Sequence, residues 1–261
     1  MQQANAFKRF CIRRKNKPQN VVKYAKYLEA FASKINHDTA TLGYVLGLSG
    51  GIDSSLALAI LSQNTKVVGV FIDIESSKED RLHAESLQDK FKFEYKYINL
   101  TKIYLDLVKA LKIEDSKVAK INLKSRLRSN CLYALANKNQ MLTCGTTNAD
   151  EKLVGYYTKF GDNACDLSLL CYLTKANIRY LAGQYQIPNS IIDKQPSAGL
   201  YVGQTDEADM GITYQEIDHY LSFAHIDPTQ EAKINTRYVA NKHKLNAPIK
   251  PKRFISLRNV K

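Results

Sequence analysis

Apolar residues recur along the chain at two spacings, and the way these spacings alternate predicts the fold class. Residues 21–35 carry apolar side chains at helical spacing, whereas residues 42–48 and 66–74 are short apolar runs typical of buried strands. Residues 94–100 predict a third strand. Further helices are expected over residues 54–63, 78–91, 116–137, 174–185 and 214–223, and a short strand over residues 140–144. Strands that alternate with helices in this order predict parallel βαβ units, and therefore an α/β fold with a doubly wound, Rossmann-like parallel sheet.

The chain is expected to form a single domain. No repeat, low-complexity tract or linker divides its 261 residues, and this length is ordinary for one α/β domain. Within it we expect a basic and helical N-terminal extension over residues 1–40, a nucleotide-binding core over residues 41–225 and a helical C-terminal tail over residues 226–261.

One predicted junction between a strand and a helix has the composition of a phosphate-binding loop. Residues 47–55 have the sequence Gly-Leu-Ser-Gly-Gly-Ile-Asp-Ser-Ser, at the carboxyl end of a strand, where open α/β sheets bind ligands. The adjacent Gly50 and Gly51 allow the backbone to approach an anion closely, and the free N–H groups of the following helix point at it. Asp53 would repel a polyphosphate unless a magnesium ion bridged the two. The alternative is a plain turn in which Asp53 caps the helix.

This loop differs from two common phosphate-binding motifs and resembles a third. It lacks both the Gly-Lys-[Ser/Thr] of a Walker A motif and the GxGxxG of a dinucleotide-binding turn. Residues 49–54, Ser-Gly-Gly-Ile-Asp-Ser, resemble the SGGxDS loop of the N-type ATP pyrophosphatase superfamily, which has an adenine nucleotide alpha hydrolase-like fold. Members of this superfamily release pyrophosphate from ATP and transfer AMP to a carboxylate or carbonyl oxygen.

Several further motifs narrow the resemblance to one family. In chain order they are Arg-Leu-Arg at 126–128, Gly-Thr-Thr-Asn-Ala-Asp-Glu at 145–151, Gly-Tyr-Tyr-Thr-Lys-Phe-Gly-Asp at 155–162, Leu-Thr-Lys at 173–175, Lys-Gln-Pro-Ser-Ala at 194–198, Gln-Thr-Asp-Glu at 204–207 and His-Lys at 243–244. In this order the motifs are similar to those of NAD synthetases. An ordered set is much more specific than any one of its members.

The resemblance implies a two-step reaction. The nicotinate carboxylate of deamido-NAD attacks the α-phosphorus of ATP, and ammonia then converts the deamido-NAD adenylate to NAD and AMP, the final step of NAD biosynthesis. No covalent nucleophile is needed, so no catalytic residue is named. Glutamine-dependent members carry a large additional amidase domain for which 261 residues leave no room, so ammonia is the expected nitrogen donor. Members are homodimers with deamido-NAD at the subunit interface.

The resemblance also implies which residues form the site. ATP is expected to contact Gly47, Leu48, Ser49, Gly50, Gly51, Ile52, Asp53, Ser54, Thr146, Lys175 and Ser197. Deamido-NAD is expected to contact Arg126, Lys159, Asp166, His243 and Lys244. Magnesium is expected between Asp53 and Glu151. Each of these lysines and arginines, taken alone, also fits a solvated surface position.

One part of the family pattern is missing. After the second strand the family typically has an arginine followed by Pro-Tyr, whereas residues 70–76 here are Val-Phe-Ile-Asp-Ile-Glu-Ser. Asp73 or Arg81 is a candidate for the lost contact with ATP. This departure leaves open a non-catalytic nucleotide-binding protein as one alternative.

Charge and cysteine content change this picture little. The net charge of +13 fits a tRNA-modifying enzyme of the same superfamily, but the lysines are spread along the whole chain. We therefore favour a basic surface over nucleic-acid binding. No run of apolar residues is long enough to span a membrane, and the five cysteines are scattered without CxxC spacing. A reducing compartment is expected, and the cytoplasm is the default.

Overall fold

The apolar runs pair as neighbouring strands in the computed structural model, which describes residues 18–197, 199, 201, 203–222 and 224–245. The strands are β1 (Tyr44–Gly47), β2 (Val67–Asp73), β3 (Glu94–Asn99), β4 (Leu142–Gly145) and β5 (Leu167–Ser168). They form one sheet in the order β3-β2-β1-β4-β5, and each strand pairs in parallel with its neighbours. The chain reverses its direction of travel across the sheet between β1 and β4, which creates a switch point at their carboxyl ends.

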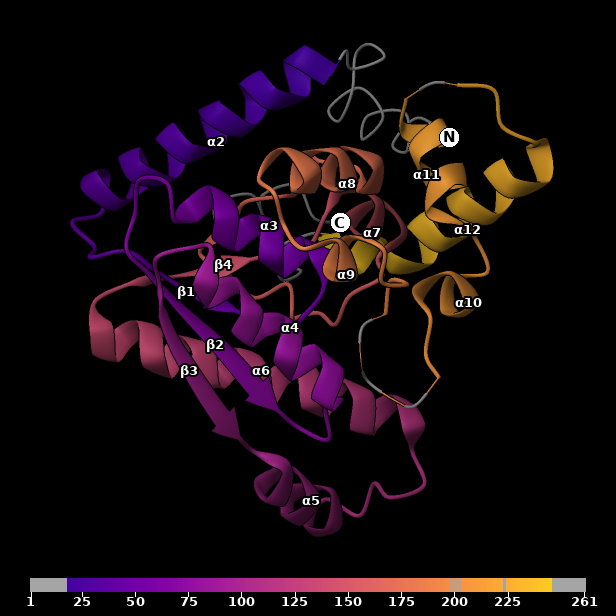
Figure 1. The fold of residues 1–261 in the computed structure, drawn as a ribbon. Helices are drawn as coiled ribbons and strands as arrows, with labels where there is room; N and C mark the ends of the chain where they lie inside the picture. The colour runs from indigo at the N-terminus through magenta and orange to yellow at the C-terminus, as the bar shows by residue number, and fades with distance from the viewer. Residues whose placement is uncertain (1–17, 198, 200, 202, 223, 246–261) are drawn as a thin grey trace, which may run out of the picture.

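Helices cover both faces of this sheet (Figure 1). They are α2 (Pro18–Asp38), α3 (Ile52–Leu61), α4 (Lys78–Ser86), α5 (Thr101–Ala110), α6 (Lys117–Asn139), α7 (Ala149–Val154), α8 (Lys175–Gln184), α9 (Asn189–Ile192), α10 (Asp206–Met210), α11 (Tyr214–Leu221) and α12 (Pro228–Leu245), with a 3-10 turn η1 (Leu87–Asp89) after α4. The cluster of buried residues on one face includes α2, α3 and α8, and the cluster on the other includes α5 and α6. The predicted doubly wound α/β sheet is therefore confirmed.

The period-two alternation of the strands explains why both faces are apolar. In β1, Tyr44 and Leu46 belong to the α3 face, whereas Val45 belongs to the α6 face. Helix α3 is buried along almost its whole length because it lies between the sheet and the helices α2 and α8. Tyr44 also donates a hydrogen bond of 2.8 Å to the carbonyl of Ala32, which joins the central strand to α2.

A second, smaller apolar cluster joins α7, α11 and α12 beyond the edge of the sheet. Figure 1 shows α10, α11 and α12 gathered on one side of the molecule, and α7 carries the chain from the end of β4 towards them. The cluster fixes α7 in place, and α7 carries Glu151. It thereby ties a site residue to elements more than 60 residues later in the chain.

All the helices and strands expected from periodicity are present, most with ends shifted by one to three residues. Five further elements were not predicted, namely α5, α7, α9, α10 and β5. All but α5 are six residues or shorter, too short for an apolar period to establish itself. No helix among the described residues is long and apolar enough to cross a membrane. The proposed extension over residues 1–40 and tail over residues 226–261 lie partly outside the described residues.

Candidate active site

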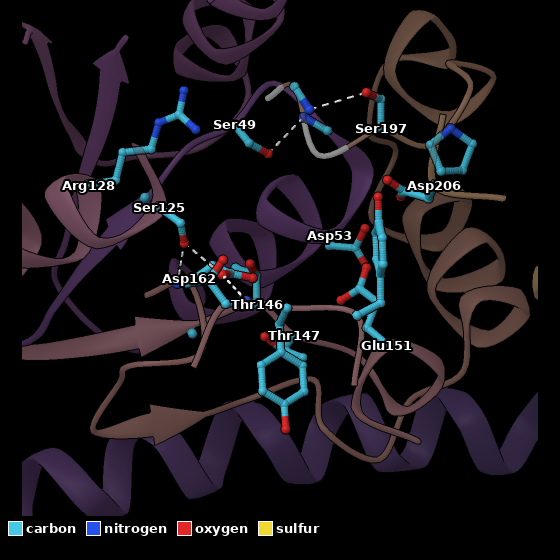
Figure 2. A pocket seen from close by; sticks show the side chains of 18 of the residues that line it. Ser49, Asp53, Ser125, Arg128, Thr146, Thr147, Glu151, Asp162, Ser197 and Asp206 are labelled. Atoms are coloured by element: carbon cyan, nitrogen blue, oxygen red, sulfur yellow. Dashed lines mark hydrogen bonds between the residues drawn. The ribbon is translucent and has the colours of Figure 1, made fainter. Parts of the chain in front are cut away.

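A cavity of about 450 Å³ opens at the carboxyl ends of β1, β2 and β4. Its walls come from the loops after β1 and β4, the inner side of α6, and the segment around residues 194–209. Figure 2 shows how side chains from these separate segments converge on it. Its position at the switch point between β1 and β4 is where an open α/β sheet presents a ligand site.

The loop after β1 has the geometry of an anion-binding turn. Gly50 has a φ of +76°, and a Cβ there would lie 2.3 Å from the carbonyl oxygen of Asp80, so only glycine fits. The hydroxyl of Ser54 bonds to the backbone of Ser49 and Gly51 at 3.2 and 3.0 Å, which braces the turn from inside. Helix α3 begins at Ile52 after an uncapped Gly51, so no side chain occupies the end of the helix. The free N–H groups of α3 are therefore available to a ligand.

Asp53 is not the helix cap that the alternative interpretation required. It lies in the first turn of α3, and its carboxylate faces across the cavity to the Nζ of Lys175, 2.5 Å away. Its other oxygen accepts a hydrogen bond of 2.9 Å from Asn148. Lys175 is only 2% exposed. Burial acts to lower the pKa of Lys175, but the carboxylates of Asp53, Glu151 and Asp206 outweigh it and raise that pKa above its usual value. The lysine is therefore charged.

Two more carboxylates stand beside this ion pair (Figure 2). Glu151 forms a capping box with Asn148 at the start of α7, and the hydroxyl of Tyr214 donates to Asp206 at 2.9 Å and lies 3.3 Å from Glu151. Burial raises the pKa of Glu151 to about 8, and the neighbouring Asp53 adds to the rise while Lys175 opposes it. Burial also raises the pKa of Asp206, whose buried Oδ1 has no hydrogen-bond partner among the described residues. Three carboxyl groups therefore surround one lysine, so the acidic groups outnumber the basic ones here.

Most of the predicted ATP-contacting residues lie together on the cavity wall. The wall includes Gly47, Leu48, Ser49, Gly51, Ile52, Asp53, Thr146, Lys175 and Ser197, and also the predicted magnesium ligand Glu151. Gly50 and Ser54 do not line it, because the first packs against Asp80 and the second bonds within the turn. These two residues shape the loop.

The residues expected to hold deamido-NAD lie mostly apart from this cavity. Lys244 lines it, and together with Lys159 it also lines a smaller adjoining cavity of about 400 Å³. Arg126 is exposed and bonds to the carbonyl of Lys159 at 3.3 Å, while the Nζ of Lys159 donates to the carbonyl of His243 at 2.7 Å. Asp166 accepts bonds from Thr143 and a long one from Tyr133, and lines neither cavity. The structure thus brings Arg126, Lys159, His243 and Lys244 to one face next to the cavity.

The structure adds two residues that the sequence did not single out as ligands. Asp206 belongs to the Gln-Thr-Asp-Glu motif, and Arg128 is the second arginine of the Arg-Leu-Arg motif, so the signal was present in both. Arg128 reaches the carboxyl end of β2, where its Nε donates to the carbonyl of Ile72 at 3.3 Å. Asp73 and Arg81, the two candidates for an ATP contact after the second strand, do not line the cavity. Asp73 bonds to Tyr97 and Asn99, and the Arg81 guanidinium lies 4.2 Å from the ring centroid of Tyr97.

Comparison with known proteins agrees with this geometry. The sequence profile of the family described as NAD synthase matches residues 24–248. An NH(3)-dependent NAD(+) synthetase from Malacoplasma penetrans is 38% identical over 86% of this chain and 94% of its own length. Among solved structures, an NMN synthetase from Francisella tularensis aligns with a TM-score of 0.86 and 32% identity, over 91% of this chain and 100% of that chain. An NH3-dependent NAD synthetase from Campylobacter jejuni aligns with a TM-score of 0.74 and 26% identity over the same shares.

Proposed function

The chain belongs to the NAD synthase family, and we propose that it uses ATP and ammonia to convert deamido-NAD to NAD. One observation carries the proposal: a glycine-rich anion loop, a buried lysine and three carboxylates meet in one cavity at the switch point of the sheet. The proposed products are NAD, AMP and pyrophosphate, and the relatives named NH(3)-dependent support free ammonia as the nitrogen donor.

The residues of the cavity suit adenylate chemistry. In the first step a carboxylate oxygen of the nicotinate bonds to the α-phosphorus of ATP, and the bond from that phosphorus to the bridging oxygen of pyrophosphate breaks. In the second step the nitrogen of ammonia bonds to the acyl carbon, AMP leaves with the former carboxylate oxygen, and the nitrogen loses one proton to form the amide. The loop N–H groups at the start of α3 would hold the pyrophosphate, and Lys175 would neutralise charge beside it. No side chain need form a covalent bond.

We also propose magnesium as the metal, held by Asp53 and Glu151 together with phosphate oxygens of ATP. The described residues contain no set of three side chains that would hold a metal unaided. Magnesium commonly takes one or two carboxylates and completes its shell with water and substrate phosphate, so two ligands are enough. The raised pKa of Glu151 and the partnerless Oδ1 of Asp206 both indicate a place where a cation would relieve unfavourable negative charge. Magnesium would offset the charge that develops on the departing pyrophosphate.

The decisive experiment is to incubate the purified protein with ATP, magnesium, deamido-NAD and ammonium, and to follow NAD, AMP and pyrophosphate by mass spectrometry. We expect NAD and AMP to form in equal amounts, and we expect Asp53→Asn to form much less of both. Asp106→Asn, at an exposed position outside the cavity lining, is the matched control and should retain full activity. Folded protein that binds ATP but forms no NAD would refute the proposal.

A second substrate has a specific observation in its favour. The Francisella tularensis protein is named an NMN synthetase, and this chain aligns with the whole of it at a TM-score of 0.86. The rival substrate is therefore nicotinic acid mononucleotide, which carries the same nicotinate carboxylate without the adenylate half. Supplying both substrates in one reaction and comparing the rates of NAD and NMN formation gives the ratio of the two kcat/KM values. We expect NAD to form faster, and a ratio that favours NMN would reassign the substrate.

We further propose that the active form is a cytoplasmic homodimer. Phe160, which is 60% exposed, lies at the smaller cavity beside Lys159 and Lys244, and such a surface suits burial against a second copy. The four described cysteines are free thiols, as expected in a reducing compartment. Light scattering of the purified protein tests the dimer, and a monomeric mass at micromolar concentration would count against it.

A further inference from the structure

Arg128 differs from the other cations on the wall of the large cavity. Lys175 and Lys194 each pair with a carboxylate, that of Asp53 and that of Asp80 respectively. The other two bind main-chain carbonyls at short range: Arg237 at 2.7 and 2.6 Å, and Lys244 at 2.7 and 3.0 Å. Among the described residues, Arg128 donates two hydrogen bonds, both of 3.3 Å, one to the carbonyl of Ile72 and one to the hydroxyl of Ser76. No described carboxylate forms an ion pair with it.

A guanidinium that is partly removed from water and has few hydrogen-bond partners raises the free energy of the folded, ligand-free protein. It has five N–H donors, and its two long bonds leave most of them without an acceptor in the part of the chain that the structure describes. Crowding by the protein acts to lower the pKa of Arg128, although Asp73, Asp162 and Asp80 oppose this from longer range. An arginine keeps its charge under such conditions, so an anion in the cavity would gain a strong, charge-assisted contact.

The position of Arg128 indicates which part of a ligand it meets. Ile72 lies near the carboxyl end of β2, and β2 pairs with β1 directly before the phosphate loop, where Leu48 donates to the carbonyl of Val70 at 2.9 Å. One helical turn beyond Arg128 on α6, Leu132 stands within 3.1 Å of where a Cβ of Gly47 would be. The lining residues Gly47, Val70 and Leu132 thus form an apolar part of the cavity next to Arg128.

Figure 2 shows the two ends of the cavity. Arg128 stands on one side with Ser125, whereas Asp53, Glu151 and Asp206 stand on the other. Suppose that a nucleotide places its base in the apolar part and its terminal phosphates at the α3 turn. Its ribose and α-phosphate would then lie between the apolar part and that turn. Arg128 borders that stretch.

We propose that Arg128 binds the α-phosphate end of ATP and so supplies the cation that β2 itself lacks. The inference rests on the proposed function, since it takes ATP to be the nucleotide. It assigns to Arg128 a contact with the phosphate at which the adenylate forms. It does not extend to the pyrophosphate part of ATP, which the α3 turn receives.

The test compares binding of ATP with binding of pyrophosphate, both measured by calorimetry in the presence of magnesium. Losing a charged hydrogen bond weakens binding by roughly ten- to a hundredfold. We expect Arg128→Gln to weaken the binding of ATP by that factor and the binding of pyrophosphate by less than twofold. The affinity of Arg128→Lys for ATP should lie between those of Arg128→Gln and the wild type. Arg81→Gln is the matched control, because it removes an arginine from outside the cavity lining, and it should leave both ligands unchanged.

The outcomes separate this inference from the proposed function. If the wild type binds no ATP, the proposed function itself fails. If the wild type binds ATP and a folded Arg128→Gln binds it equally well, the inference is wrong and the proposed function stands. Equal weakening of ATP and pyrophosphate would also overturn the inference, because it would place Arg128 at the terminal phosphates or in a general structural role. In steady-state assays the KM for ATP should rise while the KM for deamido-NAD stays within twofold, and the reverse pattern would assign Arg128 to the nicotinate substrate.

Discussion

Replacing Lys175 with methionine tests whether the buried ion pair organises the carboxylates of the cavity. Lys175 is 3% exposed at its side chain and Asp53 is 19% exposed, so water screens this pair poorly. Methionine keeps much of the length of the side chain and its contacts, and removes the charge. Asp53, Glu151 and Asp206 would then face one another with no cation between them.

The expected cost follows from the burial. Removing one partner of a buried pair generally costs about 3–5 kcal/mol, because the remaining charge is left without compensation. The upper half of that range is the better expectation here, because Lys175 serves three carboxylates and not one. Urea denaturation of the ligand-free protein measures the change in the free energy of unfolding.

A double-mutant cycle separates the ion pair from the loss of packing. Asp53→Asn should recover part of the cost in the Lys175→Met background, with a coupling free energy of about 0.5–3 kcal/mol. Lys102→Met is the matched control. It also removes a lysine from an ion pair, but that pair is 89% and 65% exposed, and its loss should lie within experimental error. A loss below about 1 kcal/mol in Lys175→Met, or strictly additive effects in the cycle, would refute the reasoning.

Three further predictions concern single residues. Gly155→Ala should lower the Tm by several degrees, because Gly155 has a φ of +67° and a Cβ there would lie 2.2 Å from a neighbouring side chain. Gly183→Ala is the control: a Cβ at Gly183 would meet nothing within 4 Å, so calorimetry should find no such fall in its Tm. Iodoacetamide at pH 8 should spare Cys144 and Cys165, because burial raises the pKa of both thiols, that of Cys165 to about 11; mass spectrometry that found either one rapidly modified would contradict this. The pKa of Glu151 rises from 4.5 in the unfolded chain to about 8, so the folded protein holds the extra proton and its stability should fall as pH rises from about 5 to 8 without metal. Glu151→Gln should flatten that slope, and an unchanged slope in urea titrations would refute the assignment.

The fold was predictable because each of its central strands and helices has a clear local pattern of apolar residues. The runs that became β1 and β2 are apolar on both faces, as strands covered by helices on both sides must be. Helix α7 was not predictable in this way. It has six residues, and it depends on the capping box between Asn148 and Glu151 and on packing against α11 and α12. Strand β5 has two residues and is defined by pairing with β4 alone.

The site was only partly predictable for a different reason. A lysine is usually a solvated surface residue, and nothing in the Leu-Thr-Lys motif alone reveals that Lys175 is buried. Its burial depends on Asp53, which lies 122 residues earlier. Arg126 and Arg128 show the same limit, since they are two residues apart and point to different places. Arg126 bonds to Lys159 outside the cavity, and Arg128 reaches β2 within it.

The distribution of charge in the cavity bears on the role of a metal. The chain carries a net charge of +13, which on its own suggests a basic site for polyphosphate. The cavity wall does not fit that suggestion. Its acidic residues are Asp53, Asp80, Glu151, Asp162, Asp206 and Asp209, and its basic residues are Arg128, Lys175, Lys194, Arg237 and Lys244. Two of the lysines are already neutralised by carboxylates, so the cavity is poorer in available positive charge than the protein around it. This shortage of positive charge is the reason why the proposed function assigns a magnesium ion to the carboxylates at one end of the cavity, while Arg128, which forms no ion pair among the described residues, stands at the other.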